Sequence, residues 1–403
     1  MSTNSQTLNF TQSIKAAPKQ VFYAFTHASA LNEWLCDFST VIPNPGGRIY
    51  LWWNTGYFTS GEFTVVEKDE KLSFTWHGHQ DPSDSKVNVS LLPEGENTLV
   101  SLEHSGFGSG GSWTNIIQQC KEGWENGLEN LTSVLETGKD WRFIRRPMLG
   151  IIVGEFNEDI AKKLGVPVDK GTRIDDPVKG LGAEAAGLQS DDVIVSIAGQ
   201  ETTDHPSITN ALKAHRAVDK VEVIFYRGDE KKSVMMELSS RPFPEIPEKT
   251  TDFSKAVETG YSEQYKELTK FLEGVTEEEA SFIPRKDEWS IKDTIAHLVQ
   301  GERFLNIWIS GVIGGFQPHY DDFGGNLPVV NQATLAAYPT LPEILEQLKR
   351  LNKETVALVK GLPDDLPIYK NIYWRLGITL LESPYHFEVH LNQMRETLEL
   401  SRK

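Results

Sequence analysis

The chain has 403 residues, of which 39% are hydrophobic and 24% charged, and its formal net charge is −17. The length exceeds one ordinary hydrophobic core and indicates two or three globular domains. Because the net charge is strongly negative, we expect neither nucleic acid nor an anionic membrane surface as a partner.

The beginning of the chain and its cysteines predict a cytoplasmic location. The segment MSTNSQTLNFTQ has neither the basic region nor the apolar region of a signal peptide. Cys36 and Cys120 are too few for a disulfide framework or a thiolate metal site. The apolar stretch 304–316 is too short to span a bilayer.

The sequence indicates two domain boundaries. The first lies at about 136–146, where a helical pattern ends at Gly138 and the basic segment RRP follows. The second is 239–250, SSRPFPEIPEKT, whose three prolines disfavour both helix and central strand. We therefore predict three domains, at 1–139, 145–241 and 250–403.

The first domain is predicted to be strand-rich. A strand at 10–14 precedes a helix that opens at Pro18, and further strands are expected at 48–54, 61–67, 71–76, 86–92 and 97–104. The domain closes with an amphipathic helix at about 112–135, along which four apolar residues have helical spacing, Trp124, Leu128, Leu131 and Leu135. A curved antiparallel sheet wrapped around this helix suits the order of elements.

The residues of this domain resemble a known family. The ordered motifs KAAPKQVFYAFT, LNEWL, PGGRI, LSFTW and GWENGLENL resemble the START-like (SRPBCC) superfamily, most of all the activator family of the ninety-kilodalton heat-shock-protein ATPase. The resemblance implies a helix-grip fold with a cavity between sheet and helix, which in many members binds a small apolar ligand. Candidate lining residues are aromatic, and packing in an ordinary core is the alternative for them: Trp52, Trp53, Phe63, Trp76 and Trp124.

The middle domain combines strands with short helices. The segment LGIIV predicts a strand, Pro206 to His215 a helix, and 221–226 with 233–238 a hairpin around the turn Arg227-Gly228-Asp229. The run AEAAGLQSDDVIVSIAGQ resembles a PDZ domain of the kind found in HtrA-type serine proteases, a β-sandwich or barrel. No Gly-x-Ser-Gly nucleophile motif precedes it, so a protease is not implied.

The PDZ resemblance implies that a protein C-terminus binds as an added strand. Leu149, Gly150 and Ile151 would form the carboxylate-binding loop, with Ile151 and Val153 beside the peptide. Ile208 and Leu212 would line its side-chain pocket. A fold that only spaces domains is the alternative.

The C-terminal domain is predicted to be helical. Helices are expected at about 253–273, 290–311, 340–361 and 379–398, and a long connection at 314–332 suggests an up-down bundle with one crossover. Capping boxes are predicted for the last three helices, beginning at Ser290, Thr340 and Thr379. Pro384 is expected in the second turn of the last helix, where it would kink it.

Three histidines of this domain form a candidate metal site. His386 and His390 have i, i+4 spacing and project from one helix face, and His297 lies in the apolar segment TIAHLV of another helix. Three imidazoles suit zinc or nickel better than magnesium or calcium, which prefer oxygen ligands. Spacing alone leaves two surface histidines on an acidic helix as an equal alternative.

The surrounding residues resemble the DinB/YfiT-like family of metal-binding four-helix bundles. The segments EWSIKDTIAHL and YHFEVHLNQM carry the resemblance, and it implies a divalent metal held by His297, His386 and His390. Glu302 is a candidate for orienting a ligand, whereas Glu388 points to another face.

The resemblances leave the overall function open. One expectation is a metal-dependent thiol transferase or hydrolase, because a metal lowers the pKa of a bound water or thiol. The other is a stress-related adaptor or scaffold without catalysis, which binds protein C-termini, a chaperone or a small apolar ligand and forms a homodimer through its bundle.

Overall fold

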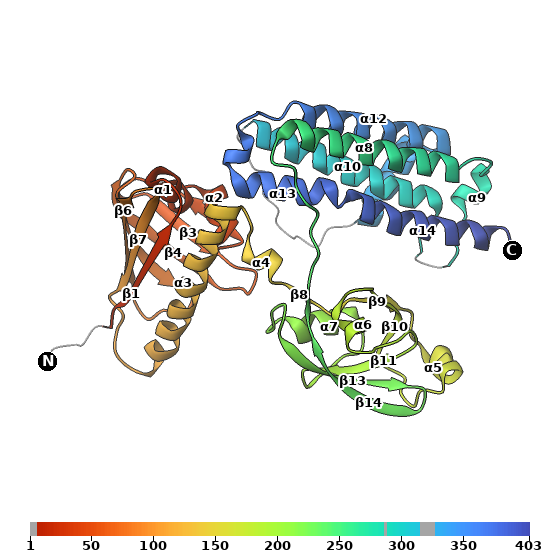
Figure 1. Cartoon of the computed structure of the whole chain (residues 1–403), viewed down its shortest axis with the longest axis horizontal. Helices are drawn as coiled ribbons and strands as arrows, with labels where there is room; N and C mark the ends of the chain where they lie inside the picture. Colours follow the sequence, from red (N-terminus) through yellow and green to blue (C-terminus); the bar gives the residue numbers. More distant parts are fainter. Residues whose placement is uncertain (1–5, 286–287, 315–326) are drawn as a thin grey trace. The chain divides into compact units, whose positions relative to one another are not determined.

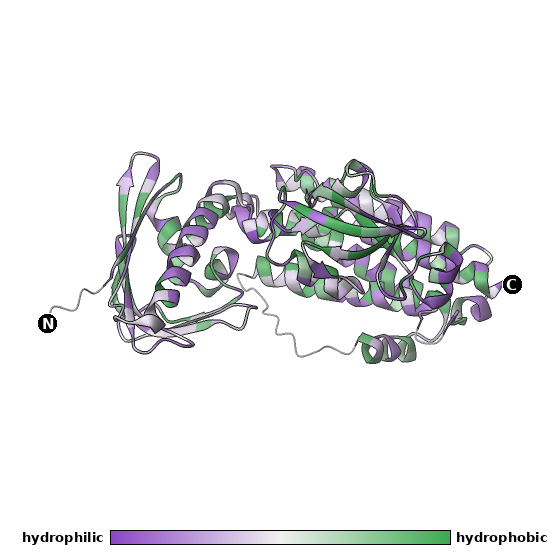
Figure 2. Ribbon diagram, turned by 90° about the horizontal axis from the view of Figure 1, so that it is seen from below, coloured by the Kyte–Doolittle hydropathy of each residue, from purple (hydrophilic) through white to green (hydrophobic). Residues whose placement is uncertain are grey.

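A computed structural model describes residues 6–285, 288–314 and 327–403. It divides into two compact units, one formed by Met1–Gly138 with Phe243–Lys403 and the other by Lys139–Pro242 (Figure 1). Hydrophobic and hydrophilic residues alternate along the strands and helices (Figure 2). No helix of the described residues has both the length and the apolar character needed to cross a bilayer.

The N-terminal domain is an antiparallel sheet packed against a long helix. The strands follow the sheet order β1-β7-β6-β5-β4-β3-β2. Their bounds are β1 Leu8–Ile14, β2 Phe38–Val41, β3 Arg48–Trp52, β4 Phe58–Glu67, β5 Lys71–Gly78, β6 Ser85–Glu94 and β7 Asn97–Ser105. The helices are α1 Pro18–Thr26, α2 Ala28–Trp34 and α3 Gly111–Thr137. This arrangement confirms the predicted helix-grip fold.

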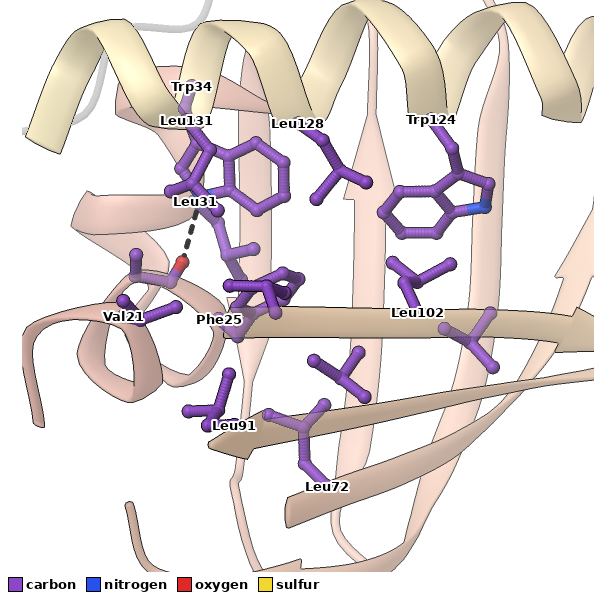
Figure 3. Packing of buried hydrophobic residues seen from close by; sticks show 14 of the residues in the cluster. Val21, Phe25, Leu31, Trp34, Leu72, Leu91, Leu102, Trp124, Leu128 and Leu131 are labelled. Atoms are coloured by element: carbon purple, nitrogen blue, oxygen red, sulfur yellow. Dashed lines mark hydrogen bonds between the residues drawn. The ribbon is translucent and has the colours of Figure 1, made fainter. Parts of the chain in front are cut away.

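The alternation of buried and more exposed side chains along the strands explains why the sheet has one buried face. Every second residue of β7 is buried, from Thr98 to His104. Leu128 and Leu131 of α3 point toward this face, and the indole of Trp34 donates a hydrogen bond of 3.0 Å to the carbonyl of Ala24 (Figure 3). The core therefore lies between α3 and the sheet.

The middle domain is a small sheet with short helices, as expected of a PDZ fold. Its sheet has the order β14-β13-β11-β10-β9, with β12 paired to β11, and β15 pairs with β8. The strands are β8 Pro147–Met148, β9 Ile151–Gly154, β10 Thr172–Pro177, β11 Val193–Ile197, β12 Gln200–Glu201, β13 Lys220–Arg227, β14 Glu230–Glu237 and β15 Ser239–Ser240. The helices are α4 Trp141–Ile144, α5 Glu158–Leu164, α6 Gly182–Ala185 and α7 His205–Leu212.

The C-terminal domain is a helical bundle. Helices α8 Thr250–Phe271 and α10 Ile291–Ile313 each pack against both α12 Leu341–Lys360 and α14 Ser383–Ser401. Shorter elements are α9 Glu277–Ser281, α11 Leu327–Ala337, the 3-10 helix η1 Leu366–Ile368 and α13 Lys370–Leu381. The predicted capping boxes at Ser290 and Thr340 are confirmed.

The predicted start of the last helix is wrong. Thr379 lies inside α13, and α14 begins after Glu382, with Pro384 in its first turn. Proline lacks an N–H and suits the first turn, so it starts a new helix here and does not kink a continuous one. The predicted connection 314–332 also contains the start of α11, while 315–326 lie outside the described residues.

The proline-rich segment before the bundle packs against it. The hydroxyl of Tyr373 donates a hydrogen bond of 2.7 Å to the carbonyl of Pro247. A Cβ on Gly377 would lie 2.5 Å from Cδ1 of Ile246, so α13 needs glycine at this contact. The segment predicted as a linker therefore has specific contacts with α13.

Candidate functional site

The three predicted metal ligands come together between two neighbouring helices. His297 lies on α10, whose N-cap is Ser290, and the serine side chain accepts a hydrogen bond from the N–H of Asp293. His386 and His390 lie one turn apart on α14, which packs against α10. Their candidate ligand nitrogens all lie within 4.8 Å of one another.

The distances within the triad suit a shared ion. The Nε2 atoms of His386 and His390 are 3.1 Å apart. Two nitrogens bound to zinc at tetrahedral angles lie about 3.3 Å apart, given bonds of about 2.0–2.1 Å. The ring centroid of His297 lies 4.9 Å from that of His390 and 5.6 Å from that of His386. The triad could therefore hold one metal ion.

The electrostatics of the triad keep the imidazoles of His297 and His386 available as ligands. The pKa of His297 is lowered to about 4, mainly because burial disfavours the charged ring and also because His390 and His386 are close. Burial, followed by the proximity of His390, also lowers the pKa of His386. Above these pKa values the rings are neutral and keep a free lone pair, which a metal ligand needs.

Two neighbours of the triad were not predicted from the sequence. Oε1 of Gln393 lies 3.0 Å from Nδ1 of His390, so it can accept the proton of that nitrogen and leave Nε2 free. The ring of Trp289 stacks on His390 at 6.3 Å and lies 5.1 Å from that of His297. Gln393 is three residues after His390, so its helical spacing was the signal that could have found it.

Glu302 has a different environment from the one expected. It is 8% exposed, and its two carboxylate oxygens accept hydrogen bonds from Tyr261 at 2.9 Å and Thr355 at 2.6 Å. Within the described residues neither oxygen bonds to a histidine of the triad. Its carboxylate thus organises the bundle core, and Glu388 is exposed as expected.

The predicted peptide-binding residues of the PDZ domain lie around one edge of its sheet. β9 carries Ile151 and Val153 and is the last strand of the sheet, paired with β10 alone among the described strands. Leu149, Ile208 and Leu212 belong to the buried cluster beneath it. An exposed strand edge beside an apolar cluster is what β-strand addition requires.

The loop before β9 contains a glycine whose backbone is in the left-handed region. Gly150 has a φ of +79°, and a Cβ there would lie 2.4 Å from Cβ of Leu181. The carbonyls of Leu149 and Gly150 accept hydrogen bonds from Ala183 and Val178. Their own N–H groups donate to no other atom that the structure describes. These two donors are therefore available to a carboxylate.

A cavity of about 350 Å³ opens between the long helix and the sheet of the N-terminal domain. Its apolar lining consists of Leu35, Trp53, Trp76, Ile116 and Trp124. Its polar lining consists of Thr55, Tyr57, Asp81, Gln119 and Cys120. Cavities of this size hold small organic molecules.

The predicted aromatic residues divide between this cavity and the core. Trp53, Trp76 and Trp124 line the cavity. Phe63 lies in the core at 1% exposure, and Trp52 is half-buried at the end of β3. Side chains alternate between the two faces of a strand, so neighbours such as Trp52 and Trp53 cannot be assigned from composition alone. Asp81 and Tyr57 were missed because they lie in loops between strands.

Family models match each of the three parts. Residues 15–136 match the family described as activator of Hsp90 ATPase homolog 1-like protein, 147–238 match the PDZ domain, and 261–394 match the DinB superfamily. The three predicted family resemblances are confirmed.

Curated relatives share a limited region with this chain. A probable periplasmic serine protease do/HhoA-like from Haemophilus influenzae is 29% identical over 126 residues, covering 31% of this chain and 26% of that protein. A probable periplasmic serine endoprotease DegP-like from Pseudomonas fluorescens is 31% identical over 134 residues, covering 32% and 26%. The chain thus spans about a quarter of the length of these relatives.

Solved structures also share one region. CalU16 from Micromonospora echinospora is 26% identical with a TM-score of 0.29, covering 33% of this chain and 75% of that one. The Aha1 dimer from Colwellia psychrerythraea is 21% identical with a TM-score of 0.31, covering 33% and 98%.

Proposed function

We propose that this chain, which joins an activator-type START-like domain, a PDZ domain and a DinB superfamily bundle, binds one zinc or nickel ion through His297, His386 and His390. The observation that carries the proposal is the convergence of three histidine nitrogens from two helices within 4.8 Å. Nitrogen ligands favour these metals over magnesium and calcium.

One orphaned atom adds support for a ligand in the site. Nδ1 of His297 is buried and has no hydrogen-bond partner within the described residues. A buried polar nitrogen without a partner costs free energy, which a metal ion bound through this nitrogen would relieve. Gln393 would hold His390 with its Nε2 directed at His386.

The site suits the chemistry of a thiol transferase or a hydrolase. A divalent metal would supply Lewis acidity that activates a thiol or a water near neutral pH. In the chain itself, Trp289 would cover one side of the triad and keep bulk water from His297 and His390. We propose such an activity for the bundle, and a non-catalytic adaptor is the second candidate.

Metal analysis of the purified full-length protein tests the ligand set. We expect about one equivalent of zinc or nickel in the wild type. In His386→Ala the metal content should fall strongly, because only two imidazoles remain and they bind the ion more weakly than three. His77→Ala is the matched control, since His77 is a surface histidine that pairs with Asp84. Equal metal content in wild type and His386→Ala would contradict the proposal.

We also propose that the PDZ domain binds a protein C-terminus. The free edge of β9, the donors at Leu149 and Gly150, and the buried cluster of Ile208 and Leu212 support an extended peptide with an apolar last residue. Fluorescence anisotropy with a peptide library tests this. Binding should be lost when the terminal carboxylate is replaced by an amide, and equal affinity for both forms would contradict it.

If the protein is a non-catalytic adaptor, the PDZ domain should still bind its peptide in His297→Ala, and no metal-dependent turnover of a thiol or an ester should be detected. A homodimer through the bundle belongs to this reading, and sedimentation of the full chain measures it. We further propose a cytoplasmic location, which the two free cysteines, Cys36 and Cys120, support.

A further inference from the structure

The cavity of the N-terminal domain has a continuous aromatic wall. The rings of Trp53 and Tyr57 lie 5.3 Å apart, those of Trp53 and Trp76 6.4 Å, and those of Trp76 and Trp124 5.5 Å. All four residues line the same space. An aromatic face carries negative electrostatic potential, so several such rings around one space favour a cation over a neutral group of the same shape.

The indole N–H groups of the three tryptophans already donate hydrogen bonds within the protein. Trp53 donates its N–H to the carbonyl of Leu35 at 2.7 Å, and Trp124 donates to Nδ1 of His104 at 3.1 Å. Trp76 donates to the hydroxyl of Tyr57 at 3.3 Å. These bonds leave no indole donor for an anionic or hydrogen-bond-accepting ligand, and they hold the rings in place.

One carboxylate, that of Asp81, lines the same space as the aromatic wall, and no Lys or Arg is among the lining residues. Asp81 is 9% exposed and lines the cavity. Its Oδ2 accepts a hydrogen bond of 2.7 Å from the N–H of Gly78. Within the described residues it forms no ion pair, and the nearby side chain of His77, which opposes the rise that burial causes in the pKa of Asp81, pairs with Asp84. Burying a carboxylate without a direct ion-pair partner is costly, so a cation bound in the cavity beside Asp81 would be stabilised.

The other titratable groups of the lining are neutral. Burial raises the pKa of the Cys120 thiol to about 12, and burial also raises the pKa of the Tyr57 hydroxyl. Burial also raises the pKa of Asp81, and a bound cation would oppose this shift because it stabilises the carboxylate. Asp81 is therefore the group of the lining that can carry a negative charge near neutral pH, and none of the lining residues is cationic.

We propose that this cavity binds a small organic cation, a quaternary or tertiary ammonium with an apolar body, whose charge lies between the aromatic rings and Asp81. The volume of about 350 Å³ admits a molecule of this class. A fatty acid or another anion would be repelled by Asp81, and a purely apolar molecule would bury that carboxylate without a partner. The proposal concerns the N-terminal domain alone and does not depend on the metal site.

Calorimetric titration of the full-length protein with two probes of the same shape tests the charge requirement. Phenyltrimethylammonium carries the cation, and tert-butylbenzene replaces its nitrogen with carbon. We expect the cation to bind at least about 10-fold more tightly, because the aromatic faces and the carboxylate of Asp81 both attract a positive charge that tert-butylbenzene lacks. This comparison needs no variant. Equal or weaker binding of the cation, or no binding of it at millimolar concentration, would overturn the proposal.

Two variants locate the charge. Asp81→Asn keeps an oxygen for the N–H of Gly78 and should reduce the affinity for phenyltrimethylammonium about 10- to 100-fold, while that for tert-butylbenzene stays the same or rises. Asp84→Asn is the matched control because Asp84 is exposed and pairs with His77. Near-ultraviolet circular dichroism confirms that each variant is folded. An unchanged affinity of Asp81→Asn for the cation, or an equal loss in Asp84→Asn, would refute the role of Asp81.

Discussion

Replacing Glu302 tests the buried polar network of the bundle. Its carboxylate accepts hydrogen bonds from Tyr261 of α8 and Thr355 of α12, so one side chain of α10 joins three helices. Glu302→Ala removes the acceptor for both hydroxyls, and each buried donor left without a partner costs about 1–3 kcal/mol. Thr355 keeps a contact with Asn306. We therefore expect a loss of about 2–4 kcal/mol in the unfolding free energy of the bundle.

The same network makes a prediction about pH. Burial raises the pKa of Glu302 above its ordinary value of 4.5, so the folded state binds this proton more tightly than the unfolded state. The stabilisation from that proton is fully present below the unfolded pKa and is lost as the pH rises through the folded pKa. Glu302→Gln cannot ionise, so it should remove this decline.

Hydrogen exchange of the full-length protein measures both effects locally, in peptides from α10 and α12. Glu354→Ala is the control, since Glu354 is exposed on α12 beside Thr355 and should change stability by no more than about 0.5 kcal/mol. A loss in Glu302→Ala no larger than in this control would refute the reasoning. So would a pH dependence that Glu302→Gln leaves unaltered.

Three further substitutions test other parts of the account. Gln393→Ala should lower metal affinity about 10- to 100-fold in a competition titration, because His390 loses the partner that orients it; unchanged affinity would speak against that role. Arg227→Met should destabilise the PDZ domain by about 3–5 kcal/mol in chemical denaturation, because Asp192 is fully buried and would lose its cation. A loss of unfolding free energy no larger than that caused by removing a solvent-exposed charge would contradict this. Gly150→Ala should weaken peptide binding measured by anisotropy, because its φ of +79° is strained for alanine; wild-type affinity would show that the loop is not used.

The sequence predicted most of the architecture because its strongest patterns coincide with burial. The alternation along β7 and the apolar stripe of α3 both follow from one buried face, and local spacing is enough to see them. The break between α13 and α14 was missed because Thr379 and Glu382 have capping-box spacing, although Thr379 lies within the last turn of α13 and Glu382 directly follows this helix. Whether such a pair caps a helix depends on the residues before it, which pack against other parts of the bundle.

The candidate sites differ in how far the sequence could define them. The triad was predicted as a set because His386 and His390 are one turn apart and His297 lies in a recognisable segment. The charge of the N-terminal cavity was not predicted, because Asp81 comes from a loop and meets Trp124 only when the sheet folds against α3. Contacts between residues that are distant in the chain carry no local signal, and the structure is needed to find them.

The most direct test of the metal site is the X-ray absorption spectrum of the zinc- or nickel-loaded full-length protein. We predict imidazole scattering from three histidines with nitrogens at about 2.0–2.1 Å for zinc, and a loss of imidazole scattering in His386→Ala. A shell of oxygen ligands alone, or the same spectrum in wild type and His386→Ala, would contradict the assignment of His297, His386 and His390 as the metal ligands.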